Sequence, residues 1–233
     1  MKSAKRAALL ASTSVFAGMT QTDIDALADV TGSRRYPKGQ PIVRQGDPAH
    51  SLFVIAEGLV KVVISSPEGA TLIVATLGPG EVFGELGAIE GTTASASVET
   101  VEPTTVVTLS RATLLDLLAT QRSVADMLLR SLGTMIRRQN EQAGDLVFLD
   151  LEARVAKLLL ALVETDGQPT ADGVELHLKL TQSDLGAMVG GSRQSVNQTL
   201  HAFEQRGYVE RRGRAVIVKD LAALRRRANP TGA

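Results

Sequence analysis

The chain has 233 residues, of which 44% are hydrophobic and 21% are charged, and its formal net charge is zero. This length accommodates one full core and a small second domain, and the composition is that of an ordinary soluble globular protein. The sequence contains no cysteine and three widely spaced histidines, His50, His177 and His201. This composition excludes disulfides, thiolate zinc sites and iron–sulfur clusters, and it argues against any metal site.

The N-terminal segment begins with Lys2, Lys5 and Arg6 before a short apolar run, as secretory signals do. Residues 12–14 are Ser-Thr-Ser, and they interrupt that run early. No other stretch approaches the roughly 18 apolar residues that a membrane span needs. We therefore expect a cytoplasmic protein without a membrane segment.

Residues from about 20 to 110 contain short β-branched runs separated by glycines, a pattern that predicts an antiparallel β-barrel or β-roll. The runs occupy residues 42–43, 52–55, 59–64, 71–77 and 98–109. Two of them, 59–64 and 71–77, are joined through Pro67-Glu-Gly and predict a β-hairpin.

From about residue 111 the pattern becomes helical, and residues 121–149 carry an apolar stripe with alternating spacings of three and four. The stripe consists of Leu129, Leu132, Ile136, Gln139, Ala143 and Leu146. It is narrower than the buried face of a helix that packs only on its own domain, so it indicates a parallel partner helix and a homodimer. Gln139 and the adjacent Asn140 either set the helix register or contact a ligand at the dimer axis.

Beyond residue 150 the sequence predicts a helix at 151–164, a loop at 165–169 and an alternating strand at 174–180. Residues 181–233 carry nine basic and four acidic side chains, whereas residues 1–149 carry thirteen basic and fifteen acidic ones. Such asymmetry suits an anionic polymer bound near the C-terminus. A solvated charged face is the alternative until the motifs are considered.

Two short helices separated by a glycine-containing turn predict a helix-turn-helix in this basic segment. Thr181 begins the first helix, Gly190 follows its end, and Ser192 caps the second. In this motif the N-terminal residues of the second helix enter the major groove, where Arg pairs with guanine and Gln or Asn with adenine. The predicted base contacts are Arg193, Gln194, Asn197 and Gln198. A polar helix face without a partner is the alternative.

Residues 207–218 predict two short strands that turn near Gly213, typical of a wing whose arginines neutralise DNA phosphates. Hydroxyl groups at the two helix starts are predicted to contact phosphates as well. The predicted phosphate contacts are Thr181, Ser192, Ser195, Arg211, Arg212 and Arg214.

Several stretches resemble one protein family. Residues 180–186 (Leu-Thr-Gln-Ser-Asp-Leu-Gly) and 191–197 (Gly-Ser-Arg-Gln-Ser-Val-Asn) are similar to the DNA-binding domain of the cyclic-AMP receptor/fumarate-nitrate regulator (Crp/Fnr) superfamily. Residues 42–58 resemble the first motif of its cyclic-nucleotide-binding domain, and residues 83–87 (Phe-Gly-Glu-Leu-Gly) resemble the opening of its phosphate-binding cassette. The likeness covers most of the chain, in the family's domain order.

The resemblance implies an α+β protein with three parts. These are an N-terminal antiparallel β-roll sensor of the cyclic-nucleotide-binding type with N-terminal helices (1–120), a long dimerisation helix (121–149), and a C-terminal winged helix-turn-helix (150–233). The implied function is a homodimeric transcription regulator that binds a near-palindromic operator in double-stranded DNA and contacts RNA polymerase if it is an activator. Because the sequence shows no Ser/His/Asp set, metal-ligand spacing or P-loop, we do not expect an enzyme.

The resemblance also assigns an effector site in the β-roll, which would bind cyclic AMP or another nucleotide. The matching positions are Gly84, Glu85, Leu86, Ser95, Gln139 and Asn140. The family's cassette has an Arg immediately before the small hydroxyl, where this chain has Ala94. Losing a charge-assisted bond to a buried phosphate costs about 2–5 kcal/mol, so cyclic AMP is a weakened candidate. Effector-independent DNA binding and a different effector remain alternatives.

The DNA-contacting positions also depart from the family pattern. Arg193 matches the family's guanine-contacting Arg, whereas Gln194 stands where Glu is common and Gln198 where a second Arg is common. We therefore expect a related half-site that is altered at one or two base pairs. A protein of another class, a ligand-binding regulatory module that acts on a protein partner such as a kinase, would explain the β-roll alone.

Overall fold

The computed structural model describes residues 1–213 and 215–229. The chain divides into two compact units, the first ending at Gln139 and the second beginning at Asn140. The division falls inside one long helix, which the sequence had placed in a segment of its own.

The first unit contains two four-stranded antiparallel sheets, built from runs rich in the β-branched residues that strands favour. The first sheet has the order β1-β8-β3-β6, with β1 Gly32–Tyr36, β8 Thr104–Ser110, β3 Ser51–Glu57 and β6 Val82–Phe83. The second sheet has the order β2-β7-β4-β5, with β2 Pro41–Val43, β7 Ser97–Thr100, β4 Val60–Ser65 and β5 Thr71–Leu77. Side chains from both sheets form a buried apolar cluster: Tyr36, Ile55, Val60, Phe83, Val98 and Val106.

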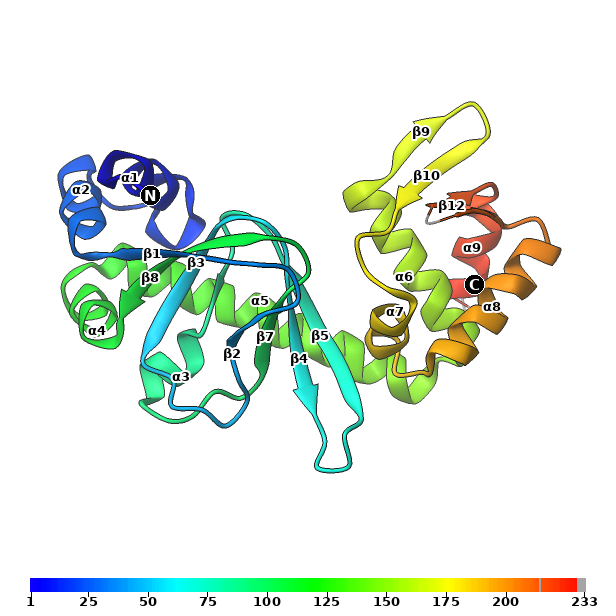
Figure 1. Cartoon of the computed structure of the whole chain (residues 1–233), viewed down its shortest axis with the longest axis horizontal. Coiled ribbons are helices and arrows are strands. Elements are labelled where there is room, and N and C mark those ends of the chain that lie inside the picture. Colours follow the sequence, from blue (N-terminus) through cyan, green and yellow to red (C-terminus); the bar gives the residue numbers. More distant parts are fainter. Residues whose placement is uncertain (214, 230–233) are drawn as a thin grey trace. The chain divides into compact units, whose positions relative to one another are not determined.

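Short helices lie mainly to the left of these sheets in Figure 1. They are α1 Ser3–Ser12, the 3-10 helix η1 Ser14–Phe16, α2 Gln21–Val30, α3 Glu85–Glu90 and α4 Arg111–Thr120. A second and larger apolar cluster joins these helices to β3, β8 and the start of the next helix. Its members include Leu10, Phe16, Leu27, Leu52, Leu109, Leu114, Val124 and Leu128.

The long helix α5, Arg122–Phe148, has two different faces. Val124 and Leu128 are buried in the core of the first unit. Leu129 and Ile136, on another face, are 66% and 54% exposed. This second face is the apolar stripe from which the sequence predicts a partner helix.

The second unit contains α6 Leu151–Asp166, β9 Gln168–Thr170, β10 Gly173–His177, α7 Gln182–Met188, α8 Arg193–Gln205, β11 Val209–Arg212, β12 Ala215–Val218 and α9 Leu221–Ala228. Its antiparallel sheet has the order β11-β12-β10-β9. The helices and the sheet share one apolar core around Leu159, Leu200 and the fully buried Phe203. This core fixes the two helices of the helix-turn-helix against α6.

The structure confirms the β-roll, the long helix and the winged helix-turn-helix. It also confirms the hairpin, in which β4 and β5 pair antiparallel. Strand predictions were wrong at four places. Strand β9 begins at Gln168, inside the predicted loop 165–169, and β10 ends at His177, before the predicted end at residue 180. The run 98–109 is not one strand, because it breaks between β7 and β8 at Val101-Glu-Pro, where proline has no N–H to donate to the sheet. The strand-like region 20–110 also includes two helices, α2 and α3.

Candidate effector cavity and DNA interface

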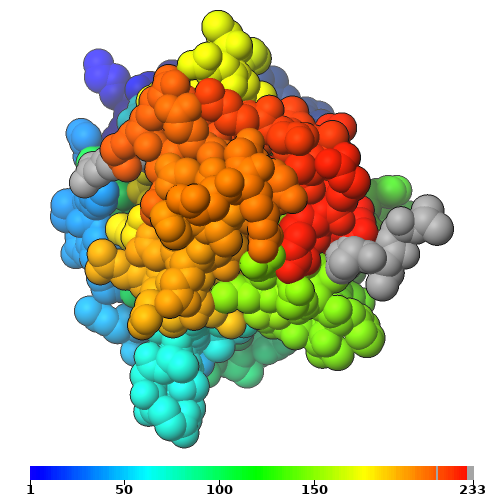
Figure 2. Space-filling model, turned by 90° about the vertical axis from the view of Figure 1, so that its right-hand side faces the viewer, coloured from blue at the N-terminus to red at the C-terminus, as the bar shows by residue number. Residues whose placement is uncertain are grey.

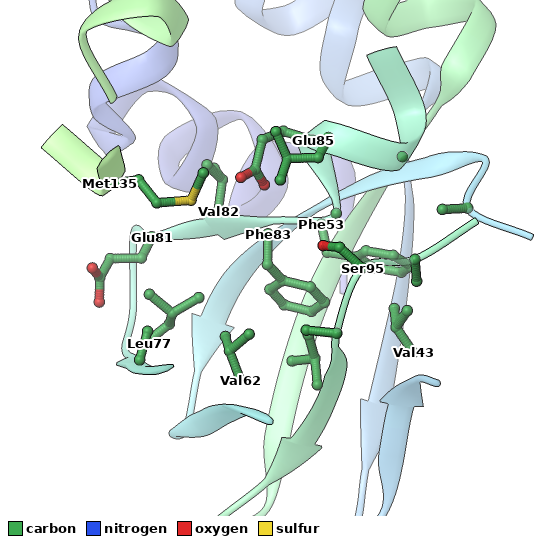
Figure 3. A pocket seen from close by; sticks show the side chains of 18 of the residues that line it. Val43, Phe53, Val62, Leu77, Glu81, Val82, Phe83, Glu85, Ser95 and Met135 are labelled. Atoms are coloured by element: carbon green, nitrogen blue, oxygen red, sulfur yellow. The ribbon is translucent and has the colours of Figure 1, made fainter. Parts of the chain in front are cut away.

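The β-roll contains a cavity of about 680 Å³, a size typical of small-molecule sites. Its wall is mainly apolar and includes the stacked rings of Phe53 and Phe83, whose centroids are 4.9 Å apart. Val62 and Leu77 line the part of the cavity below Phe83, and Met135 of α5 lies near its upper side (Figure 3). The sequence analysis missed these wall residues, because they come from strands and a helix far apart in the chain.

Gly84 turns the chain from β6 into α3 with a positive φ of 84°. A Cβ atom there would lie 2.6 Å from the carbonyl oxygen of Ser51, so the site tolerates no side chain. This turn directs Glu85 and Leu86 to the cavity, where both line the wall together with Ser95. Of the predicted polar pair on α5, Gln139 lines the cavity and Asn140 does not.

Ala94 lines the cavity and is 9% exposed. Two backbone hydrogen bonds fix its position. The Ala94 N–H donates to the Asp47 carbonyl oxygen at 2.9 Å, and the Ala94 carbonyl oxygen accepts from the Gly46 N–H at 2.9 Å. At this position the cavity therefore has a methyl group and no cation.

Burial raises the pKa of the Glu85 carboxyl above its ordinary value of 4.5, and a backbone hydrogen bond opposes part of this effect. The folded protein therefore binds the Glu85 proton more tightly than the unfolded chain does. As a result, Glu85 disfavours folding once the pH rises above the ordinary range of a glutamate.

We predict that Glu85→Gln stabilises the first unit, because the amide occupies the same site without a charge to desolvate. Thermal unfolding should show a higher Tm for the variant than for the wild type at pH 8. Near pH 4 the two Tm values should agree, because the protonated carboxyl of the wild type is neutral, as is the amide of the variant. A Tm difference that is the same at both pH values would contradict this reasoning.

The helix-turn-helix has the predicted caps. Thr181 and Asp184 form a capping box at the start of α7, and the Ser192 hydroxyl accepts the N–H of Ser195 at 3.0 Å at the start of α8. The turn between the helices contains Gly190 with a φ of 62°. This left-handed backbone conformation favours glycine, and a Cβ atom there would also lie 2.6 Å from a methyl carbon of Leu146, which would have to move.

Four predicted base-contacting residues line one shallow surface hollow on α8, and His201 extends it. Residues 193–205 lie within the exposed orange surface of Figure 2. Among the residues that the structure describes, Arg193 has no ion pair or side-chain hydrogen bond. Asn197 differs, because its amide donates to Gln182 of α7 at 2.7 Å and thereby links the two helices.

The wing arginines that the structure describes are already engaged. Arg211 donates to Glu204 at 2.8 Å, and Arg212 donates to Asp172 at 3.0 Å and also to Glu210. The pKa of Glu210 falls to about 2, because Arg212 and then Lys219 donate hydrogen bonds to it. To contact a DNA phosphate, Arg211 or Arg212 must therefore exchange its bond to Glu204, Asp172 or Glu210 for one to the phosphate. Arg214 lies outside the described residues.

An ion-pair network fixes the start of α6, which follows directly on α5. Arg227 of α9 donates to both oxygens of Asp150 at 2.6 and 2.7 Å, and Glu152 accepts from Arg227 and from Arg206 at 3.0 Å each. These hydrogen bonds lower the pKa of Asp150 and of Glu152. Arg206 and Arg227 are two of the nine basic residues of 181–233, but both are paired with acids at the start of α6.

Within residues 1–213 and 215–229 no cluster of three or more His, Asp or Glu side chains is arranged to hold a metal ion. Over the same residues no helix combines the length and the apolar character that crossing a membrane requires.

Two family models match the chain, a cyclic nucleotide-binding domain over residues 33–121 and a Crp-like helix-turn-helix domain over residues 153–227. The chain is 31% identical over 220 residues to the CRP-like cAMP-activated global transcriptional regulator of Mycobacterium tuberculosis, covering 94% of this chain and 98% of that protein. It is also 31% identical over 210 residues to the cyclic AMP receptor protein of Thermus thermophilus, covering 90% and 94%. Among solved structures, the c-di-GMP responsive global regulator CLP of Xanthomonas campestris is similar with a TM-score of 0.74 at 25% identity, covering 82% and 94%.

A β-roll with an internal cavity, followed by a long helix and a winged helix-turn-helix, defines a DNA-binding transcription regulator that carries a cyclic-nucleotide-binding domain. The chain belongs to the Crp/Fnr superfamily. This confirms the resemblance on which the sequence analysis relied, and the relatives are transcription regulators and not enzymes.

Proposed function

We propose that the protein is a homodimeric transcription regulator that binds a near-palindromic operator and is controlled by a small effector in the β-roll cavity. The observation that carries the proposal is the exposed α8 surface, where Arg193 has no partner among the described residues and stands beside Gln194 and Gln198. Arg and Gln side chains at the start of a recognition helix are those that pair with guanine and adenine edges in the major groove.

The dimer rests on the exposed apolar stripe of α5. Leu129, Ile136 and Leu146 are all exposed in the single chain, and a parallel partner helix would cover them. Two recognition helices related by a two-fold axis then bind two half-sites, so the operator is near-palindromic. RNA polymerase is the expected further partner if the protein activates transcription.

A direct test is to select sites from a random DNA library with the full-length protein and to measure their affinity by fluorescence anisotropy. We expect two related half-sites about one helical turn apart, and a dimer in sedimentation velocity. Recovery of no enriched sequence, or a complex with one protomer per site, would overturn the proposal.

The effector is proposed to be of the cyclic-nucleotide type, with cyclic AMP weakened by Ala94. Because the Ala94 methyl group lines the cavity, Ala94→Arg places a guanidinium inside it. We predict that this variant binds cyclic AMP about thirtyfold or more tightly than the wild type in calorimetry, from one added charge-assisted bond to phosphate.

Ala94→Leu is the matched control, because it adds a larger side chain without a charge. Its affinity for cyclic AMP should not exceed that of the wild type. Equal affinity of the wild type and Ala94→Arg for cyclic AMP would show that the cavity does not hold a cyclic phosphate near residue 94. Operator binding that needs no added ligand would instead favour effector-independent regulation.

A further inference from the structure

The polar residues of the cavity are unevenly distributed. Away from α5 the wall is mainly apolar, with Phe53, Phe83, Val62, Leu77 and the methyl group of Ala94, and Ser95 adds a hydroxyl but no positive charge. On the side formed by α5, however, Arg130, Ser131, Thr134 and Arg138 line the cavity. Arg130, Thr134 and Arg138 are four residues apart, so they share one helix face.

The two arginines on this face have no partner within the described part of the chain. Neither Arg130 nor Arg138 forms an ion pair or a side-chain hydrogen bond there, and both are exposed. Arg137, which does not line the cavity, instead donates to the Thr134 hydroxyl at 3.1 Å. The two arginines that face the cavity are therefore free to bind a ligand.

Other charged or titratable residues line the cavity away from α5. Arg44, Asp47 and His50 lie on one part of the wall, which therefore carries an acidic side chain beside the basic ones. Glu81 accepts the N–H of Gly78 at 2.8 Å. Glu85 is the acid whose charged form burial disfavours.

We propose that Arg130 and Arg138 bind the anionic group of the effector, while its aromatic body enters the apolar interior beside Phe83. This rests on the proposed function and specifies its ligand: an aromatic or heteroaromatic organic anion whose charge is bound by α5 in the wild-type protein, where Ala94 supplies no cation. The opposite face of α5 carries the dimer stripe, so ligand charge acts directly on the helix that joins the two protomers.

The test uses the full-length protein and two aromatic anions, anilinonaphthalene sulfonate followed by fluorescence and cyclic AMP followed by calorimetry. The variant is Arg130→Gln/Arg138→Gln. The matched control is Arg122→Gln/Arg137→Gln, which removes two charges from the same helix at positions that do not line the cavity. All four side chains are exposed, and the control removes only surface contacts, the Arg122–Asp126 ion pair at 3.8 Å and the Arg137–Thr134 hydrogen bond, so thermal unfolding should differ little among the three proteins.

We expect the wild type to bind at least one of the two anions below about 1 mM, and Arg130→Gln/Arg138→Gln to bind it roughly tenfold or more weakly. The control should stay within about twofold of the wild type, and added salt should weaken binding to the wild type more than to Arg130→Gln/Arg138→Gln. Equal affinity in the wild type and that variant, or no binding of either anion, would overturn the inference.

Operator binding is measured on the same proteins with and without the anion, so that the two proposals fail separately. Loss of anion binding in Arg130→Gln/Arg138→Gln, but not in the control, supports the inference. A wild-type protein that binds no operator under either condition but still needs both arginines for the anion would contradict the proposed function alone.

Discussion

Arg193→Ala should weaken specific operator binding by roughly thirtyfold or more while leaving weak, salt-sensitive binding to any DNA. A bidentate pair between Arg and guanine contributes about 1–3 kcal/mol of discrimination, and a dimer contains two such pairs. Losing both costs about 2–6 kcal/mol, which is a loss of roughly thirtyfold to more than ten-thousandfold in affinity. Because Arg193 has no partner among the described residues, its removal leaves no buried acid unpaired and should not unfold the unit.

The measurement is fluorescence anisotropy at one fixed salt concentration, with the selected operator and an unrelated duplex of equal length. Arg225→Ala is the matched control, since it removes the same charge from an exposed position of α9 in the same unit. The ratio of the affinity for the operator to the affinity for the unrelated duplex should fall strongly for Arg193→Ala. The same ratio should change little for Arg225→Ala. An unchanged ratio for Arg193→Ala would remove it from the base-contacting set.

The elements that the sequence predicted well depend on local features. The helix-turn-helix is specified by the Thr181–Asp184 capping box, the Ser192 cap and the glycine turn, all within a few residues of one another. The α5 helix is specified by its own periodicity. The break at residues 101–103 was missed because the β-branched residues on both sides of Pro103 masked it.

The site was less predictable because its contacts join distant segments. Gly84 and Glu85 were found through the family motif, but the cavity wall also needs β4, β5 and α5, and no local pattern places Phe53 beside Phe83. The pairing of Asn197 with Gln182 depends on how α7 crosses α8. Arg130, Thr134 and Arg138 follow one another at four-residue spacing, but the sequence analysis did not assign them to the site, because only the structure shows that this face of α5 lines the cavity.

The apolar stripe also makes the dimer vulnerable to a single charge. We predict that Ile136→Glu converts the protein to a monomer at micromolar concentration. Ile136 is 54% exposed in the single chain, and covering that exposed half contributes about half of the roughly 1.5–3 kcal/mol of full burial in each protomer. The substitution removes this stabilisation of the dimer in both protomers. It also brings two carboxylates together at the helix interface.

The expected result in sedimentation equilibrium is a dimer dissociation constant about a hundredfold higher or more. Arg137→Glu, one residue away and outside the stripe, introduces the same acid on the same helix and should leave the dimer intact, as should Ile136→Leu. Operator affinity should fall with dimerisation, because a single α8 can occupy only one half-site at a time. If Ile136→Glu stays dimeric while Arg137→Glu dissociates, the partner helix lies against a different face of α5 and the stripe does not form the interface.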